Sequence, residues 1–142
     1  MPLCFKIEDV PDYVIIGKNS KFEWPVAFGG FGLTFERNLK TNKVYYPLKQ
    51  REHKGNIIVG DDVQIGPLSN IDRGSWRDTM IGSGTKMGSF VHVAHNCHVG
   101  QDVQLIVKSC LLGSVDVGDK TYIGADATVI QHIKIGKNCF VE

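Results

Sequence analysis

The stretch that decides the fold reads Phe90-Val91-His92-Val93-Ala94-His95-Asn96-Cys97-His98-Val99-Gly100. An apolar residue recurs at every sixth position, here at Val93 and Val99, and the recurrence runs unbroken from Ile81 to Val141. A period of six fits neither the α-helix, which repeats every 3.6 residues or so, nor a simple strand, which repeats about every two. It predicts a parallel β-helix in which each six-residue unit forms one flat side of a prism.

The remaining positions of the unit support this prediction. The second position is mostly Gly or Ala, as at Gly82 and Gly100, and the fifth is small or β-branched, as at Thr85 and Val91. We expect the first position to fill the interior, the fifth to pack the corners, and the glycines to occupy tight corners with unusual backbone conformations. A sandwich of short strands would instead need turn signals about every 8–12 residues.

The period also appears before this run. Its first apolar positions are Val59, Ile65 and Ile71, after which four extra residues stretch the spacing once, between Arg73 and Met80. We therefore expect an all-β, single-stranded parallel β-helix with regular coils over residues 57–142.

Residues 1–56 are less regular, although we assign them to the same single domain of residues 1–142. Val14–Asn19 looks like one earlier unit of the repeat, and Phe35–Tyr46 predicts a hairpin that turns at Asn38–Asn42. His53 falls in a polar run, where we expect it to be exposed and without a role.

Composition excludes several classes of partner. The net charge is +1, with no basic run or acidic tail, which gives no support for nucleic-acid binding. No apolar run approaches the length of a membrane span, and residues 1–16 lack the pattern of a signal peptide. The four cysteines show no CxxC pair, so we interpret them as reduced packing residues of a cytoplasmic protein. They are Cys4, Cys97, Cys110 and Cys139.

The repeat predicts which residues meet along the prism. Three units make one coil, so residues 18 apart stack on rungs roughly 4.8 Å apart. His95 stacks below Gly113, and two coils on comes Gln131, the neighbour of His132. We therefore predict a site along one edge that contains His95, Gly113 and His132.

These residue types suit acyl transfer. His95 can take a proton near neutral pH, and the N–H of Gly113 can stabilise an oxyanion. His132 could bind the acyl donor or orient the substrate. Each of the three could instead be an ordinary solvated corner residue, and only their shared edge favours function.

The other histidines near His95 have weaker claims. His92 and His98 both take the sixth position, which places them towards other corners. We expect His98 to be solvated, and His92 either to be solvated or to help position His95. Zinc needs three or four convergent ligands, and because these three histidines spread over different corners, we predict no metal site.

Four stretches closely resemble the UDP-3-O-acylglucosamine N-acyltransferases of lipid A synthesis, a family of hexapeptide-repeat acyltransferases. They are Asn56–Gly66, Ile71–Gly74, Asp78-Thr79 and Val93–Asn96, and Gly30-Phe31-Gly32 is similar to a segment upstream in that family. The resemblance implies a left-handed β-helix, an exception to the usual right-handed crossover. It also implies a general base at His95, an oxyanion-hole N–H at Gly113, and substrate or donor binding at His132. Asn96 is as in the N-acyl branch, whereas His92 resembles the sister O-acyltransferases.

The resemblance also implies a function. We expect an acyltransferase that moves an acetyl or 3-hydroxyacyl group from acyl-CoA or an acyl carrier protein to the amino group of a nucleotide-linked amino sugar, with no bound cofactor. His132, Asn96 and His92 would bind substrate or donor. A homotrimer with active sites between subunits is expected, in a short form without the family's N-terminal uridine-binding domain. The alternative is a non-catalytic trimeric β-helix that serves as a scaffold or binds a partner.

Overall fold

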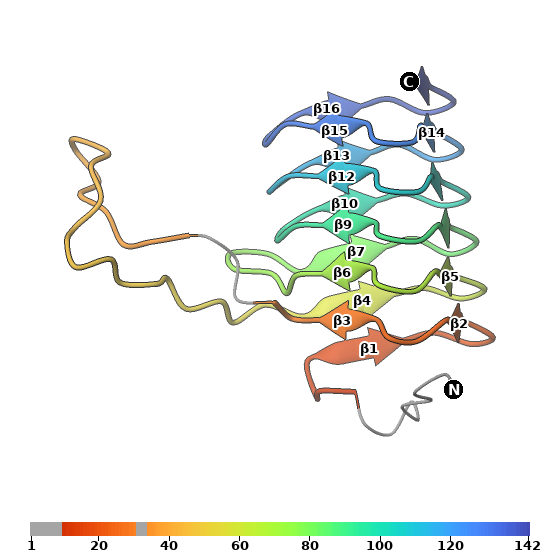
Figure 1. Ribbon diagram of the computed structural model, residues 1–142, viewed down its shortest axis with the longest axis horizontal. Coiled ribbons are helices and arrows are strands. Elements are labelled where there is room, and N and C mark those ends of the chain that lie inside the picture. Colours follow the sequence, from red (N-terminus) through yellow and green to blue (C-terminus); the bar gives the residue numbers. More distant parts are fainter. Residues whose placement is uncertain (1–9, 31–33) are drawn as a thin grey trace.

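The computed structural model describes residues 10–30 and 34–142, and within these ranges it consists of strands without any helix. The strands wind as a left-handed parallel β-helix, which confirms the predicted fold class. Strands β1 to β15 make five coils of three strands, and β16 and β17 begin a sixth. Figure 1 shows these coils stacked in one column. The described part of the chain therefore offers no helix that could span a membrane.

Each side of the prism is one parallel sheet. Sheet A contains β1 (Val14–Ile16), β4 (Ile57–Val59), β7 (Thr79–Ile81), β10 (His98–Val99), β13 (Asp116–Val117) and β16 (Lys134–Ile135). Sheet B contains β2 (Lys21–Phe22), β5 (Gln64–Ile65), β8 (Lys86–Met87), β11 (Gln104–Leu105), β14 (Tyr122–Ile123) and β17 (Phe140–Val141). Sheet C contains β3 (Ala27–Phe28), β6 (Asn70–Ile71), β9 (His92–Val93), β12 (Cys110–Leu111) and β15 (Thr128–Val129).

The register of the sheets confirms the spacing of 18 residues per coil. His98 pairs with Asp116 in sheet A. Two longer connections interrupt this spacing, since Val14 pairs with Ile57 and Ile57 in turn pairs with Thr79. The second connection holds the four extra residues predicted from the sequence. The coils begin at Val14, ahead of the regular part that we placed at residues 57–142.

The interior is filled as the repeat predicts. First-position side chains such as Leu105 and Leu111 are fully buried, and so are fifth-position ones such as Val103 and Thr121. Cys97 is also buried at a fifth position, and burial raises the pKa of its thiol to about 11. Cys97, Cys110 and Cys139 are free thiols, whereas Cys4 lies outside the described residues.

The corners are built differently from our expectation. The left-handed backbone conformation falls at the fourth position of the unit, with φ of 64° at Asn96, 61° at Ser114 and 64° at His132. The second-position glycines of the run from Ile81 to Val141 do not adopt it, so the conformational explanation for them was wrong. Their reason is steric, because a Cβ at Gly82 would collide with the carbonyl oxygen of Gly100 in the next coil.

The first long connection carries an arm, residues 34–50, which projects away from the column in Figure 1. Antiparallel bridges join Phe35 to Gln50 and Arg37 to Val44, which confirms the predicted hairpin. Most of the arm is exposed to solvent, but its base returns to the prism beside the corner between sheets C and A. Phe31 and Gly32 of the Gly30-Phe31-Gly32 motif lie outside the described residues.

Candidate active site

His95 lies in the turn that connects β9 to β10, at the corner between sheets C and A. Its side chain is half-buried, and it lines a cavity of about 570 Å³. Three successive coils contribute Ala94, Leu112 and Gln131 to its lining, and the base of the arm contributes Phe35. The His95 cavity is therefore enclosed jointly by the prism and the arm.

Asn96 determines how the His95 ring is protonated. The backbone N–H of Ser75 donates to Asn96 Oδ1 at 2.8 Å, which fixes the orientation of the amide. The amide nitrogen then faces His95 Nδ1 at 3.0 Å, so Nδ1 accepts a hydrogen bond from it. Because the hydrogen bond at one ring nitrogen sets the tautomer, the neutral ring carries its proton on Nε2, which lies 3.5 Å from Thr34 Oγ1.

Gly113 lies directly against the His95 ring, as the spacing of 18 predicts. A Cβ at Gly113 would lie 2.6 Å from His95 Cε1, so a larger residue would displace the imidazole. A backbone hydrogen bond also joins the two coils here, because the Ser114 N–H donates to the carbonyl oxygen of His95 at 2.9 Å. The N–H of Gly113 itself makes no hydrogen bond to a described residue, which leaves it available as a donor.

His132 occupies the fourth position of its unit, in line with Asn96 and Ser114 rather than with His95. Its backbone N–H donates to the carbonyl oxygen of Gly113 at 3.1 Å. The side chain is exposed and lies outside the lining of the His95 cavity, where Gln131 takes its place. His132 is nevertheless near enough to lower the pKa of His95.

His92 lines the same cavity as His95, contrary to our expectation that it turns towards another corner. Its Nδ1 lies 3.0 Å from the Asn70 amide nitrogen, and its Nε2 lies 3.6 Å from Asp72 Oδ2. Asp72 is only 5 % exposed and accepts a further hydrogen bond from Asn70. His98 lies outside this cavity, with its Nε2 3.1 Å from the carbonyl oxygen of Asp78.

His53 is the residue that sequence reasoning misjudged. It is 9 % exposed, not solvated, and its ring packs edge-to-face on His95 with the centroids 5.1 Å apart. The long connection between β3 and β4 brings it there, and that connection carries no periodic signal. The only hint in the sequence was a histidine close to the return of the chain into the regular coils.

The imidazoles of His95 and His53 both favour the neutral form. Burial is the largest cause of the lowered pKa of His95, followed by His53, while Asp72 acts in the opposite direction. Burial is also the largest cause of the lowered pKa of His53, which Asp72 again opposes. A neutral imidazole beside a free N–H can accept a proton while the N–H stabilises an oxyanion.

The described residues offer no alternative centre built on a metal. In residues 10–30 and 34–142, no three His, Cys, Asp or Glu side chains gather as metal ligands.

Comparisons with known proteins place the chain beside acyltransferases. It is 46% identical over 87 residues to UDP-3-O-acylglucosamine N-acyltransferase 2 of Rhodopseudomonas palustris, which covers 61% of this chain and 23% of the relative. It is 33% identical over 111 residues to UDP-3-O-acylglucosamine N-acyltransferase of Campylobacter lari, covering 78% of this chain and 33% of the relative. The chain thus spans only about a quarter to a third of these curated relatives. No protein-family model matches it.

Solved structures agree with the fold and with this resemblance. A crystal structure of UDP-N-acetylglucosamine acyltransferase superposes with a TM-score of 0.71 at 27% identity, covering 89% of this chain and 45% of that one. UDP-N-acetylglucosamine O-acyltransferase from Moraxella catarrhalis superposes with a TM-score of 0.57 at 26% identity, covering 91% and 51%. The similarity to hexapeptide-repeat acyltransferases that the sequence predicts is therefore confirmed.

Proposed function

We propose that this protein is an acyltransferase that moves an acyl group from a thioester donor to the amino group of a nucleotide-linked amino sugar. One observation carries the proposal: the neutral ring of His95 lies on the wall of a cavity against Gly113, whose N–H makes no hydrogen bond to any described residue. The names of the relatives support the substrate class, since they are N-acyltransferases of a UDP-linked acylglucosamine.

The reaction divides between the two residues. His95 takes a proton from the amino group of the acceptor sugar as the amine nitrogen attacks the thioester carbonyl and forms the C–N bond. The N–H of Gly113 donates to the oxyanion that develops on the carbonyl oxygen. When the C–S bond breaks, the protonated His95 returns its proton to the departing thiolate. No bound cofactor is needed, because the thioester supplies the activated acyl group.

Asn96 sets a condition on this mechanism. The nitrogen on the side of Thr34 and Gly113 is Nε2, which carries the proton while the Asn96 amide donates to Nδ1. To act as the base, Nε2 must present a lone pair, so the proton of the neutral ring must lie on Nδ1 instead. Nδ1–H then needs a hydrogen-bond acceptor. We propose that Asn96 turns its carbonyl oxygen towards Nδ1 in the active state and gives up its contact with Ser75.

The remaining parts of the proposal follow the resemblance. The acyl group is acetyl or 3-hydroxyacyl, and the donor is acyl-CoA or an acyl carrier protein in the cytoplasm. We assign His132 and His92 to binding donor or substrate, and of the two His92 lines the His95 cavity. We also propose a homotrimer, for which light scattering would give about 47 kDa, three times the 15.7 kDa of one chain. A mass of 15.7 kDa would contradict it.

A thiol-release assay tests the proposed activity. The donors are acetyl-CoA, a 3-hydroxyacyl-CoA and a 3-hydroxyacyl carrier protein, each with a panel of UDP-linked amino sugars. We expect thiol release with at least one pair, and none when the amino group of the same sugar is already acetylated. Absence of release with every donor would reject the enzyme and favour the alternative, a non-catalytic β-helix that serves as a scaffold or binds a partner.

A further inference from the structure

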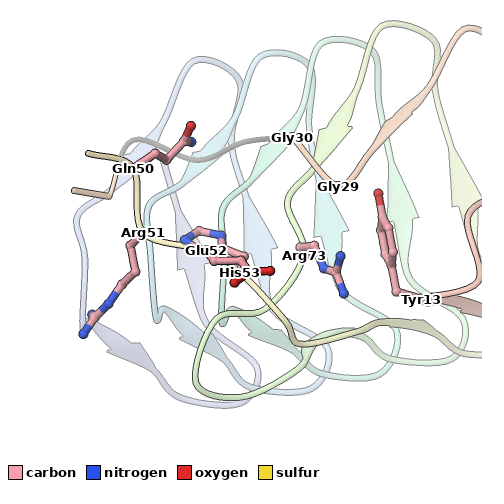
Figure 2. Close-up of a pocket in the computed structure, with 8 residues that line it drawn as sticks. All are labelled: Tyr13, Gly29, Gly30, Gln50, Arg51, Glu52, His53 and Arg73. Carbon is pink, nitrogen blue, oxygen red and sulfur yellow. The ribbon is translucent and has the colours of Figure 1, made fainter. Parts of the chain in front are cut away.

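A second cavity, of about 460 Å³, lies beside the His95 cavity and shares Gly30 and Gln50 with it. Its other lining residues are Tyr13, Gly29, Arg51, Glu52, His53 and Arg73, and we call it the Arg73 cavity. Figure 2 shows Arg73 and Tyr13 at one end and His53 between Arg73 and Arg51. Because the His53 ring also packs on His95, a group bound here would lie next to the proposed reaction centre.

Arg73 is held in place yet retains free donors. Its Nε donates to the carbonyl oxygen of Gly55 at 2.9 Å, and its Cζ lies 3.8 Å above the Tyr13 ring. The two terminal nitrogens make no ion pair or hydrogen bond to any residue in the described part of the chain. A fixed guanidinium with an unoccupied terminal edge is suited to receive an oxyanion through parallel N–H donors.

Two arginines, Arg51 and Arg73, line the Arg73 cavity together with one carboxylate, Glu52. Burial is the largest cause of the lowered pKa of His53, and Arg51 and Arg73 each lower it further, whereas Asp72 raises it by more than either arginine lowers it. Neither arginine has a carboxylate within ion-pair distance among the described residues. Of the nearby acidic groups, Glu52 lies 3.5 Å from Lys54 Nζ. Asp72 accepts a hydrogen bond from Asn70 and lies 3.6 Å from His92 Nε2. Within residues 10–30 and 34–142, neither guanidinium group is therefore ion-paired.

His53 provides an independent indication of a ligand. It is more than nine-tenths buried, and neither ring nitrogen has a hydrogen-bond partner of good geometry among the described residues. The Arg73 backbone comes close enough to raise the pKa of His53, although this is the smallest of the effects on it. Buried polar groups are normally paired, so an unpaired imidazole on the wall of a cavity lined by two arginines indicates a missing partner.

We propose that the Arg73 cavity binds a phosphate group of one of the two reactants, with Arg73 as the principal ligand and Arg51 at the outer side. This proposal rests on the proposed function in one respect only, namely the identity of the reactant that carries the phosphate. That phosphate belongs either to the nucleoside diphosphate of the acceptor or to the donor, whose coenzyme A or carrier-protein arm is a phosphate ester. Either source would be anchored beside His95, with the transferred atoms in the neighbouring cavity.

Calorimetric titration of the whole protein with pyrophosphate, UDP and coenzyme A tests this proposal without requiring turnover. Arg73→Gln should weaken binding of pyrophosphate by roughly 10- to 100-fold, as expected for loss of a charged hydrogen bond. The matched control is Arg37→Gln, which removes an exposed guanidinium whose partner among the described residues is Asn42 on the arm. Binding of pyrophosphate should not change in this control.

The pattern of the titrations also identifies the source of the phosphate. A selective loss of UDP binding in Arg73→Gln assigns the cavity to the acceptor, and a selective loss of coenzyme A binding assigns it to the donor. Equal affinity of wild type and Arg73→Gln for all three probes, or no binding by wild type, would overturn the proposal. If Arg73→Gln does not fold, Arg51→Gln replaces it, with a smaller loss expected. Phosphate binding without thiol release would retain this site while rejecting the proposed enzyme.

Discussion

Two neighbours act on the His95 ring from different sides, and each leads to a measurable consequence. Asn96 controls which nitrogen carries the proton, through the contact between its amide and Nδ1 at 3.0 Å. His53 packs edge-to-face on the His95 ring and disfavours a positive charge on that ring. The first effect concerns the tautomer and the second concerns the pKa, so substitutions can separate them.

Asn96→Asp tests the proposed exchange of the proton. One carboxylate oxygen can accept from Ser75 N–H while the other accepts from Nδ1–H, which leaves the Nε2 lone pair free. The carboxylate should also raise the pKa of His95 by stabilising the imidazolium. In a pH–rate profile we expect the acid limb to move to higher pH and turnover at pH 8 to be retained. A loss of about tenfold or more in a folded variant would contradict the assignment of Nε2 as the base.

His53→Phe tests the electrostatic coupling between the two rings. Phe keeps the ring buried but removes the positive charge that His53 can carry, which is one cause of the lowered pKa of His95. The pKa of His95 should therefore rise. Since only neutral His95 is active, the acid limb of kcat/KM should move to higher pH.

The matched control for His53→Phe is His98→Phe, because His98 lies outside the His95 cavity. That control should leave the acid limb where it is. A downward shift in His53→Phe would show that His53 does not oppose the charge on His95.

The candidate site could be predicted only where the repeat defines it. His95 meets Gly113 because residues 18 apart stack, and this contact follows from spacing alone. His53 and Thr34 reach the ring through a connection without period, so no pattern places them. The orientation of Asn96 depends on Ser75, which lies between Arg73 and Met80, where four extra residues lengthen the repeat. Contacts made by the two longer connections, which interrupt the period, therefore could not be predicted from the sequence.

The coil is the structural element, and its positions have distinct roles. First-position residues are buried between three sheets, fourth-position residues turn the chain in the left-handed conformation, and second-position glycines avoid the next coil. Periodicity reveals which positions are apolar, and this was enough to predict the prism, its register and its core. It does not report φ, which explains why the corner was assigned to the wrong position.

Leu105→Ala tests the packing of a single coil. The Leu105 side chain is fully buried, and its removal should lower the free energy of unfolding by about 2–5 kcal/mol, through lost burial and the cavity left behind. Its exposed neighbour in β11 provides the control, and Gln104→Ala should change the value by less than about 0.5 kcal/mol. Urea unfolding measures both variants, and equal stabilities would contradict the assignment of the first position to the core.

At the scale of the molecule, the prism supplies one wall of the His95 cavity and the arm supplies another. The similarity to the relatives covers 61% and 78% of this chain, which spans about a quarter to a third of their length. The proposed activity therefore requires that these coils with their arm perform the transfer, and within them His95 is the group on which the transfer depends.

The most direct test compares His95→Gln with wild type in the thiol-release assay, using the most active pair of donor and acceptor. Gln has nearly the size of His but cannot serve as a base at neutral pH, so kcat/KM should fall by roughly 10²- to 10⁴-fold. Both proteins should unfold at the same temperature, which would exclude loss of structure as the cause. Undiminished thiol release by folded His95→Gln would show that His95 is not the general base.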